Sequence, residues 1–154
     1  MTVTVRAAAP ADIPAMEALI KRSGIELSEG FYTAEQARAV TQHVFGVDTQ
    51  LVADRTKKGV DALLDPATEP ARIRAFFVEP SAARRGLGRL LLQHCTDAAA
   101  DAGFHTLELA ATMPGVPLYL ACGFSEVDTF EITLPGPVQV PLTRMRKAIV
   151  LKAG

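Results

Sequence analysis

The chain has 154 residues, of which 49% are hydrophobic, enough for one domain with a substantial core and too few for two. Its 16 Lys and Arg residues nearly balance 17 Asp and Glu residues, so no overall positive field is available to attract nucleic acid or an anionic membrane. The 2 cysteines make no disulfide framework, and their spacing with the 3 histidines matches no zinc pattern. No leader-like or membrane-length apolar run is evident. We therefore expect a single cytoplasmic domain over residues 1–154, without a metal and without a nucleic-acid or membrane partner.

The N-terminal segment predicts a strand followed by a helix. Residues 2–6 (TVTVR) alternate with β-branched residues, which is typical of a strand. Asp12 then precedes apolar residues at helical spacing, from Ile13 to Ile20, and is a candidate N-cap.

A second helix is predicted over about residues 33–45, because Thr33 and Gln36 have the spacing of a capping box. Residues 50–54 (QLVAD) are a short strand candidate. Residues 55–70 contain two prolines and a glycine without periodicity, so we expect a loop there.

The second half of the chain has the clearest patterns. Residues 72–79 (RIRAFFVE) give the best strand, which Pro80 ends, and Gly88–Ala102 gives the best helix, with Gly103 in the C-terminal capping position. The remaining predicted elements are a strand over 106–112, a short helix between Pro114 and Gly123, a strand over 124–134, a turn over 135–137 and a strand over 138–150.

The turn between the best strand and the best helix is typical of an anion site. The first N–H groups of a helix are free to bind phosphate, and Gly86 and Gly88 carry no side chain to block its approach. Arg84, Arg85 and Arg89 flank the turn and could add contacts to a diphosphate. The same pattern also describes tight turns that bind nothing.

The order of these elements and two of their motifs resemble the GNAT family of acyl-CoA-dependent N-acetyltransferases. The family's signature turn, Gln or Arg, two residues, Gly, one residue, Gly or Ala, aligns with residues 83–88, with Ala83 in place of the first side chain. Its second signature, a tyrosine four residues before Gly-Phe, matches Tyr119, Gly123 and Phe124. The resemblance implies an α+β fold in which helices flank a mixed, mostly antiparallel central sheet.

One departure from the family concerns the middle of the chain. The family normally has a strand hairpin before the strand that enters the signature turn, whereas only residues 50–54 read as a strand there. We therefore expect a sheet apparently short of one central strand, unless residues 55–70 hide an irregular one.

The resemblance also implies how acetyl-CoA would be held. The signature turn would bind the pyrophosphate through backbone N–H groups and flanking arginines. The residues concerned are Arg84, Arg85, Gly86, Leu87, Gly88 and Arg89. The main chain of Phe77 and Val78 would pair with the pantetheine arm like an added strand. Thr112, where the family often has asparagine, would donate to the same arm or cap the short helix.

By the same resemblance Tyr119 would be the general acid that protonates the leaving thiolate, although a tyrosine there can also be a packing residue. Glu79 is the candidate general base, with a solvated strand end and a role for Glu108 as alternatives. The implied reaction is acetyl transfer to a primary amine by direct attack, without a covalent enzyme intermediate. Cys95 and Cys122 fit inert packing better than a nucleophilic role.

The alternative function is a catalytically degenerate acyl-CoA-binding module with a regulatory or scaffold role, motivated by Ala83 and the missing strand. A dinucleotide-binding domain fits less well, because no acidic residue follows at the distance that grips a ribose. The acceptor, a small-molecule or peptide amine, stays open. Acidic residues in the first interhelical connection would favour a cationic acceptor, whereas Arg72 and Arg74 would favour an acidic one. The family resemblance also allows a homodimer through the late strands.

Overall fold

A mixed four-stranded sheet is the centre of the part of the chain that the computed structural model describes, which is residues 3–26, 28–45, 65–74, 76–79, 82 and 85–150. Its strands stand in the order β1-β2-β4-β3. Their bounds are Ala71–Arg72 for β1, Thr106–Thr112 for β2, Ser125–Leu134 for β3 and Val138–Ala148 for β4. The β1 and β2 strands are parallel, and the other two pairs are antiparallel. The predicted mixed, mostly antiparallel sheet is thus confirmed.

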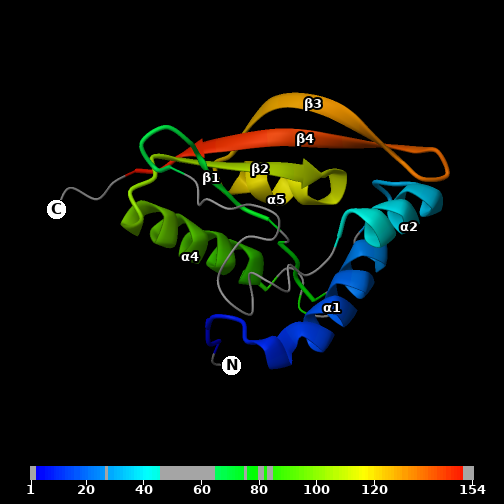
Figure 1. Cartoon of the computed structure of the whole chain (residues 1–154), viewed down its shortest axis with the longest axis horizontal. Coiled ribbons are helices and arrows are strands. Elements are labelled where there is room, and N and C mark those ends of the chain that lie inside the picture. Colours follow the sequence, from blue (N-terminus) through cyan, green and yellow to red (C-terminus); the bar gives the residue numbers. More distant parts are fainter. Residues whose placement is uncertain are drawn as a thin grey trace.

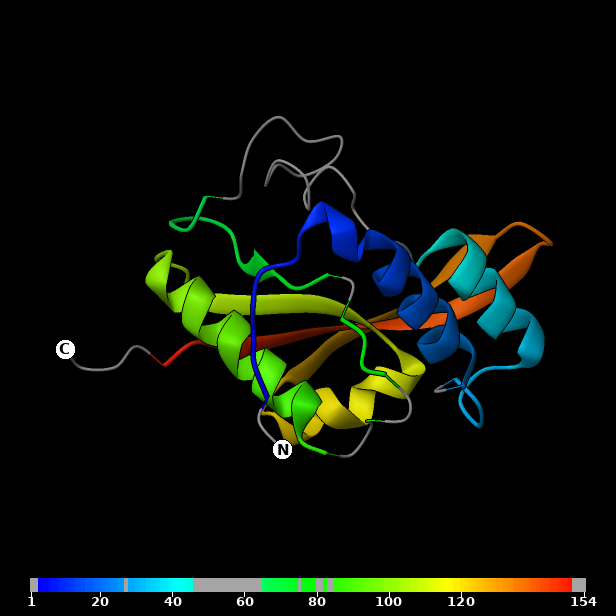
Figure 2. The same cartoon turned by 90° about the horizontal axis from the view of Figure 1, so that it is seen from below.

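The helices flank this sheet (Figure 1). Helices α1 (Ile13–Glu26) and α2 (Ala34–His43) form a hairpin near the far end of the β3–β4 ribbon, while α4 (Leu87–Asp101) and α5 (Val116–Ala121) run below β2 and β4. Figure 2, seen from below, shows α4 and α5 crossing this face of the sheet. No helix in the described ranges is both long and apolar enough to cross a membrane.

The strand predicted for residues 2–6 is wrong over residues 3–6, which belong to no strand. Two contacts hold this segment in another conformation. The Arg6 guanidinium binds both carboxylate oxygens of Asp12 at 2.7 and 2.8 Å, and the Ala9 N–H donates to the same carboxylate. Asp12 therefore closes the short 3-10 helix η1 (Pro10–Asp12) instead of capping α1. The alternating residues lack a strand partner in the described chain, and alternation alone cannot supply one.

The second helix follows its predicted signal. The Gln36 N–H donates to the Thr33 hydroxyl at 3.1 Å, and the Thr33 N–H donates to the Gln36 side chain at 3.0 Å. This capping box is confirmed. The strand candidate at residues 50–54 and the loop through residue 64 lie outside the described residues, while residues 65–70 form a turn. The expectation of a missing central strand therefore stays a prediction.

The largest correction concerns the strand predicted over residues 72–79. The β1 ladder pairs only Ala71 with Leu107 and Arg72 with Glu108, followed by one hydrogen bond from the Ile73 N–H to the Glu108 carbonyl at 3.0 Å. The rest of the predicted strand that the structure describes, residues 73, 74 and 76–79, belongs to no strand. The segment makes other contacts instead, because the Phe76 ring packs against Tyr119 and the Phe77 ring packs against Phe45.

The later elements match their predictions within one or two residues. The β2 strand has the predicted bounds, and α4 begins at Leu87 and ends at Asp101. The short helix lies between its proline and glycine signals and is preceded by a 3-10 turn, η3 (Met113–Gly115). The β3–β4 hairpin turns at residues 135–137 as predicted.

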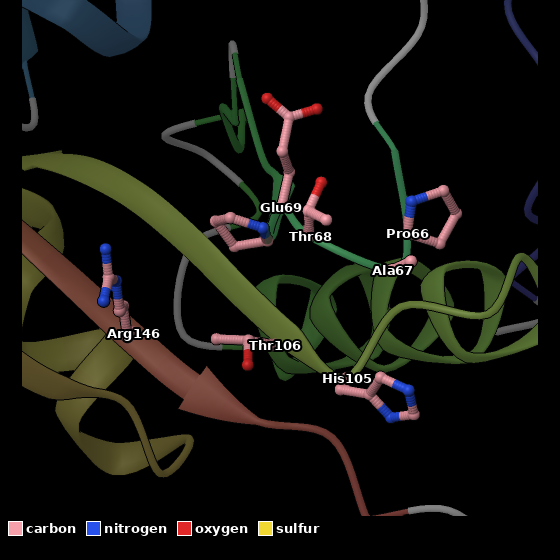
Figure 3. Close-up of a pocket in the computed structure, with 8 residues that line it drawn as sticks. Pro66, Ala67, Thr68, Glu69, His105, Thr106 and Arg146 are labelled. Atoms are coloured by element: carbon pink, nitrogen blue, oxygen red, sulfur yellow. The ribbon is translucent and has the colours of Figure 1, made fainter.

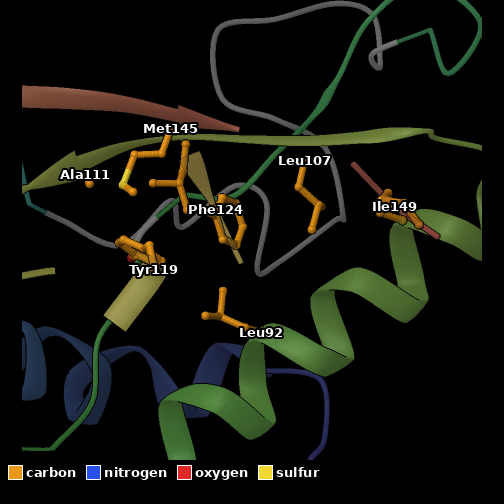
Figure 4. Close-up of a cluster of buried hydrophobic side chains, with 9 residues drawn as sticks. Leu92, Leu107, Ala111, Tyr119, Phe124, Met145 and Ile149 are labelled. Carbon is orange, nitrogen blue, oxygen red and sulfur yellow. The ribbon is translucent and has the colours of Figure 1, made fainter. Parts of the chain in front are cut away.

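Two hydrophobic clusters share the strand β4. In its first half Val138, Val140 and Leu142 pack with α2, whereas further on Met145 packs with residues of α4 and α5. The second cluster lies between the sheet and these helices, and Figure 4 shows Tyr119 and Leu92 pointing into it. The tyrosine of the second motif thus stands in the core of the protein.

Candidate functional site

The turn before α4 has the geometry of an anion cradle. Gly86 is the N-cap of α4 with φ +79°, a left-handed conformation that favours glycine. A Cβ built on Gly86 meets no described atom within 4 Å, so the space beside its backbone is open. The first turn of α4 contains no acidic residue, and the flanking Arg85 and Arg89 are exposed. Ala83 and Arg84 lie outside the described residues. Free N–H groups with nearby guanidinium groups are what a diphosphate requires.

Gly88 is glycine because of helix packing, whereas the sequence indicated the approach of a phosphate as the reason. A Cβ built on it would lie 2.9 Å from Leu118 Cδ2 and 3.8 Å from Val78 Cγ2. Gly88 is buried and lets α4 approach α5 and the segment before the turn. Its missing side chain therefore serves helix packing, which in turn sets the distance between the turn and α5.

The segment 76–79 keeps the side-chain alternation of a strand although it is not in one. The Phe76 ring packs 6.0 Å from the Tyr119 ring, on the side of α5. The next ring, Phe77, packs edge to face against Phe45 at 4.7 Å, on the side of α2. The segment thus bridges the two halves of the molecule through its side chains. The main chain of Phe77 and Val78 pairs with no described strand. Pairing with an extended ligand requires main-chain groups that are not already paired in this way.

Glu79, the candidate base, is held by an arginine that the sequence analysis did not single out. Arg22 of α1 donates from Nε to Glu79 Oε1 at 3.1 Å and from Nη2 to Oε2 at 2.6 Å. This bidentate hydrogen bonding lowers the pKa of the Glu79 carboxyl. Glu79 is therefore ionised at neutral pH and is a weak base while the pair persists.

Glu108, the competing carboxylate, is also paired. Its oxygens lie 2.6 Å from Arg146 Nε and 3.7 Å from Arg72 Nε, across the neighbouring strands β4 and β1. Its side chain is only 13% exposed. This triad ties three strands together and gives Glu108 a structural role at the splay between β1 and β2.

Tyr119 stands between two aromatic rings, at 6.0 Å from Phe76 and 5.7 Å from Phe124. A Cβ on Gly115 would lie 2.9 Å from its Cε2, so a glycine there makes room for the ring. The residue is 7% exposed, and burial raises the pKa of its hydroxyl to about 12. The phenol consequently keeps its proton at any pH at which the protein works.

The two cysteines are free thiols near this tyrosine, and both are partly buried. Burial raises the pKa of the Cys95 thiol, which disfavours the thiolate that a nucleophile requires. Cys122 packs against the core cluster at the end of α5. Both observations agree with the packing role that the sequence predicted.

Thr112 is the N-cap residue of η3 but makes no side-chain capping hydrogen bond. The Met113 N–H instead donates to the hydroxyl of Tyr32, a residue of the α1–α2 connection, at 3.0 Å. The capping alternative for Thr112 is therefore excluded, and its binding of the pantetheine arm stays a prediction. No local signal could have identified Tyr32 or Arg22, because each contacts a residue more than fifty positions away.

A pocket of about 310 Å³ lies elsewhere, at the start of β2 (Figure 3). It is lined by residues 66–70, His105, Thr106 and Arg146. None of the predicted site residues lines it, and Arg146 is already paired with Glu108. The candidate site is instead the region joined by the α4 turn, the segment 76–79 and α5.

The family model of the acetyltransferase (GNAT) domain matches residues 28–126, which include the α4 turn and Tyr119. The chain belongs to the GNAT family of acetyltransferases. Membership of this family supports acetyl transfer as the general activity of the domain. Among curated proteins, none matches the sequence significantly.

Solved structures of GNAT proteins share the fold. A GCN5-related N-acetyltransferase from Rhodopseudomonas palustris has a TM-score of 0.75 at 21% identity, over 96% of this chain and 98% of its own. The PaiA N-acetyltransferase from Thermoplasma acidophilum, in complex with coenzyme A, has a TM-score of 0.68 at 15% identity, over 96% and 99%. The putative acetyltransferase YncA from Salmonella typhimurium, with acetyl-CoA, has a TM-score of 0.60 at 16% identity, over 100% and 98%. These likenesses confirm the predicted GNAT-like fold.

Proposed function

We propose that this GNAT domain transfers the acetyl group of acetyl-CoA to a primary amine by direct attack, with Tyr119 as the general acid. The observation that carries the proposal is the place of Tyr119. Its ring packs against Phe76, the first residue of the described segment 76–79, whose neighbours Phe77 and Val78 are the predicted pantetheine partners. A proton donor thus stands beside the path expected for the thioester.

The residues of the α4 turn fit a coenzyme A diphosphate. We assign its phosphate oxygens to the N–H groups of the turn, residues 86–88, with charge from Arg85 and Arg89, and extend the assignment to Arg84 on sequence alone. Thr112, free of a capping role, and the main chain of Phe77 and Val78 would hold the pantetheine arm. The Thermoplasma and Salmonella neighbours, which contain coenzyme A and acetyl-CoA, support this assignment through their shared fold.

In the proposed reaction the amine lone pair forms the new C–N bond at the thioester carbonyl, and the C–S bond breaks as the tetrahedral centre collapses. Tyr119 gives its phenolic proton to the leaving sulfur. The nitrogen loses one proton, which Glu79 accepts directly or through water. Arg22 has to loosen its hold on Glu79 for that step, because a carboxylate bound at both oxygens is a poor base.

The raised pKa of Tyr119 has two opposing effects on this role. The phenol is fully protonated and ready to donate, but a pKa of about 12 makes it a weak acid. The same burial raises the pKa of the Cys95 thiol nearby, and would raise that of a thiolate leaving beside Tyr119. The two pKa values therefore shift together, and proton transfer to sulfur becomes less unfavourable than the phenol pKa alone implies.

Calorimetric titration with acetyl-CoA, free coenzyme A and NAD tests the coenzyme assignment. We expect acetyl-CoA and coenzyme A to bind and NAD not to bind. Thiol release with a panel of small amines and peptide N-termini then identifies the acceptor. Failure of a folded sample to bind acetyl-CoA would refute the coenzyme assignment. Binding without thiol release over the whole panel would favour the degenerate acyl-CoA-binding module.

A further inference from the structure

The segment from Met113 to Cys122, which carries Tyr119, is held at both of its ends by side chains from other parts of the fold. Tyr32 binds its first N–H, and Lys147 of β4 binds its last carbonyl, at 3.0 and 2.7 Å. Neither residue belongs to the motifs that define the site. The inference rests on the proposed role of Tyr119 and concerns how that side chain is positioned.

At the first end the Tyr32 hydroxyl extends the sheet by one position. The β2–β4 ladder ends with Thr112 opposite Leu142, so Met113 and Pro141 would be the next pair. The Tyr32 hydroxyl stands between them, accepting from the Met113 N–H at 3.0 Å and donating to the Pro141 carbonyl at 2.7 Å. Tyr32 is only 7% exposed. A buried hydroxyl with both roles used fixes the point at which the chain leaves β2.

At the second end α5 stops in a Schellman motif. The Phe124 N–H donates to the Tyr119 carbonyl at 3.0 Å, the Gly123 N–H donates to the Leu120 carbonyl at 3.1 Å, and Gly123 has φ +94°. The hydrophobic contact that accompanies such a motif is here the ring pair of Tyr119 and Phe124. This pair makes the helix end and the catalytic ring one structural unit.

Lys147 completes this unit from β4. Its Nζ donates to the carbonyl of Cys122, the C-cap residue of α5, and lies 5.9 Å from the centre of the Phe124 ring. A cation at a helix C-terminus is favoured by the helix dipole, and a half-buried one is favoured more. The Lys147 stem also packs 3.4 Å from the position that a Cβ on Gly123 would take.

We propose that Tyr32 and Lys147 are positioning residues that clamp the Met113–Cys122 segment and so hold the Tyr119 hydroxyl in register with the thioester. The α5 helix has only six residues and cannot fix its own orientation. Loss of either contact lets the segment rotate or fray. A displacement of about 1 Å at a catalytic group can lower the rate about 100-fold.

The sequence provides a direct probe, because the chain contains 2 tyrosines and no tryptophan. The near-ultraviolet circular dichroism band of tyrosine therefore comes from Tyr32 and Tyr119 alone, and Lys147 binds the end of α5. We expect Lys147→Met to weaken this band through Tyr119 while Tyr32 keeps its two hydrogen bonds, and Lys147→Arg, which keeps a donor, to restore most of it. Hydrogen exchange of a peptide covering residues 113–122 in the full-length protein should become faster with Lys147→Met alone.

Kinetics give the second readout. We expect Lys147→Met to lower kcat about 10- to 100-fold while the Kd for acetyl-CoA stays within about twofold. Arg144→Met is the matched control, since Arg144 is another β4 cation over a ring, 5.5 Å from Phe130, and pairs with Asp128 instead of α5. We expect that control to leave exchange of residues 113–122 unchanged.

The clamp is refuted if Lys147→Met leaves both the exchange of residues 113–122 and the tyrosine dichroism unchanged. The positioning role is overturned if Lys147→Met makes the exchange of residues 113–122 faster but leaves kcat unchanged, while Tyr119→Phe lowers kcat. If no amine is acetylated by the wild type, the proposed function fails, while dichroism and exchange still decide the clamp. Tyr32→Phe should likewise make the exchange of residues 113–122 faster, and unchanged exchange would remove Tyr32 from the clamp.

Discussion

Replacing Tyr119 with phenylalanine separates the chemistry of the site from its fold. The ring can keep its place between Phe76 and Phe124, because only the hydroxyl is removed. Among the described residues, the tyrosine hydroxyl hydrogen bonds belong to Tyr32, so the loss of the Tyr119 hydroxyl breaks none of them. We therefore expect the free energy of unfolding at neutral pH to change by less than about 1 kcal/mol.

Turnover should respond strongly to the same change. A positioned general acid contributes about 100- to 10,000-fold, which corresponds to about 3 to 5 kcal/mol of transition-state stabilisation. The assay is thiol release with the acceptor found in the amine panel, combined with calorimetric titration of acetyl-CoA. We expect kcat to fall by that factor and the Kd for acetyl-CoA to stay within about twofold. An unchanged kcat, or a Kd weakened in parallel with kcat, would remove Tyr119 from proton transfer.

Three further predictions follow from the described contacts. Gly86→Val should abolish acetyl-CoA binding in calorimetry, because valine resists the left-handed φ of +79° and fills the open space beside the turn, and retained affinity would contradict the pyrophosphate assignment. Arg22→Met should raise the pKa of Glu79 toward its ordinary value of 4.5. In the wild type the Arg22–Glu79 pair stabilises the folded state above that pH, and this stabilisation is lost as the pH falls below it, so the variant should show a smaller loss of stability on acidification. Identical acid unfolding curves would disprove the pairing. Because Tyr119 has its pKa raised from 10.0 to about 12, the folded state should lose roughly 2 kcal/mol as the pH rises from about 10 to 12, and Tyr119→Phe should reduce that loss in alkaline urea titrations.

The sequence predicted the elements that depend on short-range signals. The capping box of Thr33 and Gln36, the bounds of β2 and the start of α4 at the glycine turn all follow from residues within one or two turns of the chain. The two GNAT motifs are likewise local, and the family model includes both of them. Such signals act before any tertiary contact forms, which explains why they could be read correctly.

The sequence by itself therefore determined the order of most elements and the place of the turn and of Tyr119. The tertiary structure decided what these residues touch. Residues 76–79 have strand-forming side chains, but they lie outside the β1–β2 ladder, and the Phe76 and Phe77 rings pack against Tyr119 and Phe45 instead. The Arg22–Glu79 pair and the Tyr32 bridge join residues 57 and 81 positions apart, at separations that no periodicity records. Long-range pairing depends on how packed layers meet, and only the folded chain specifies that.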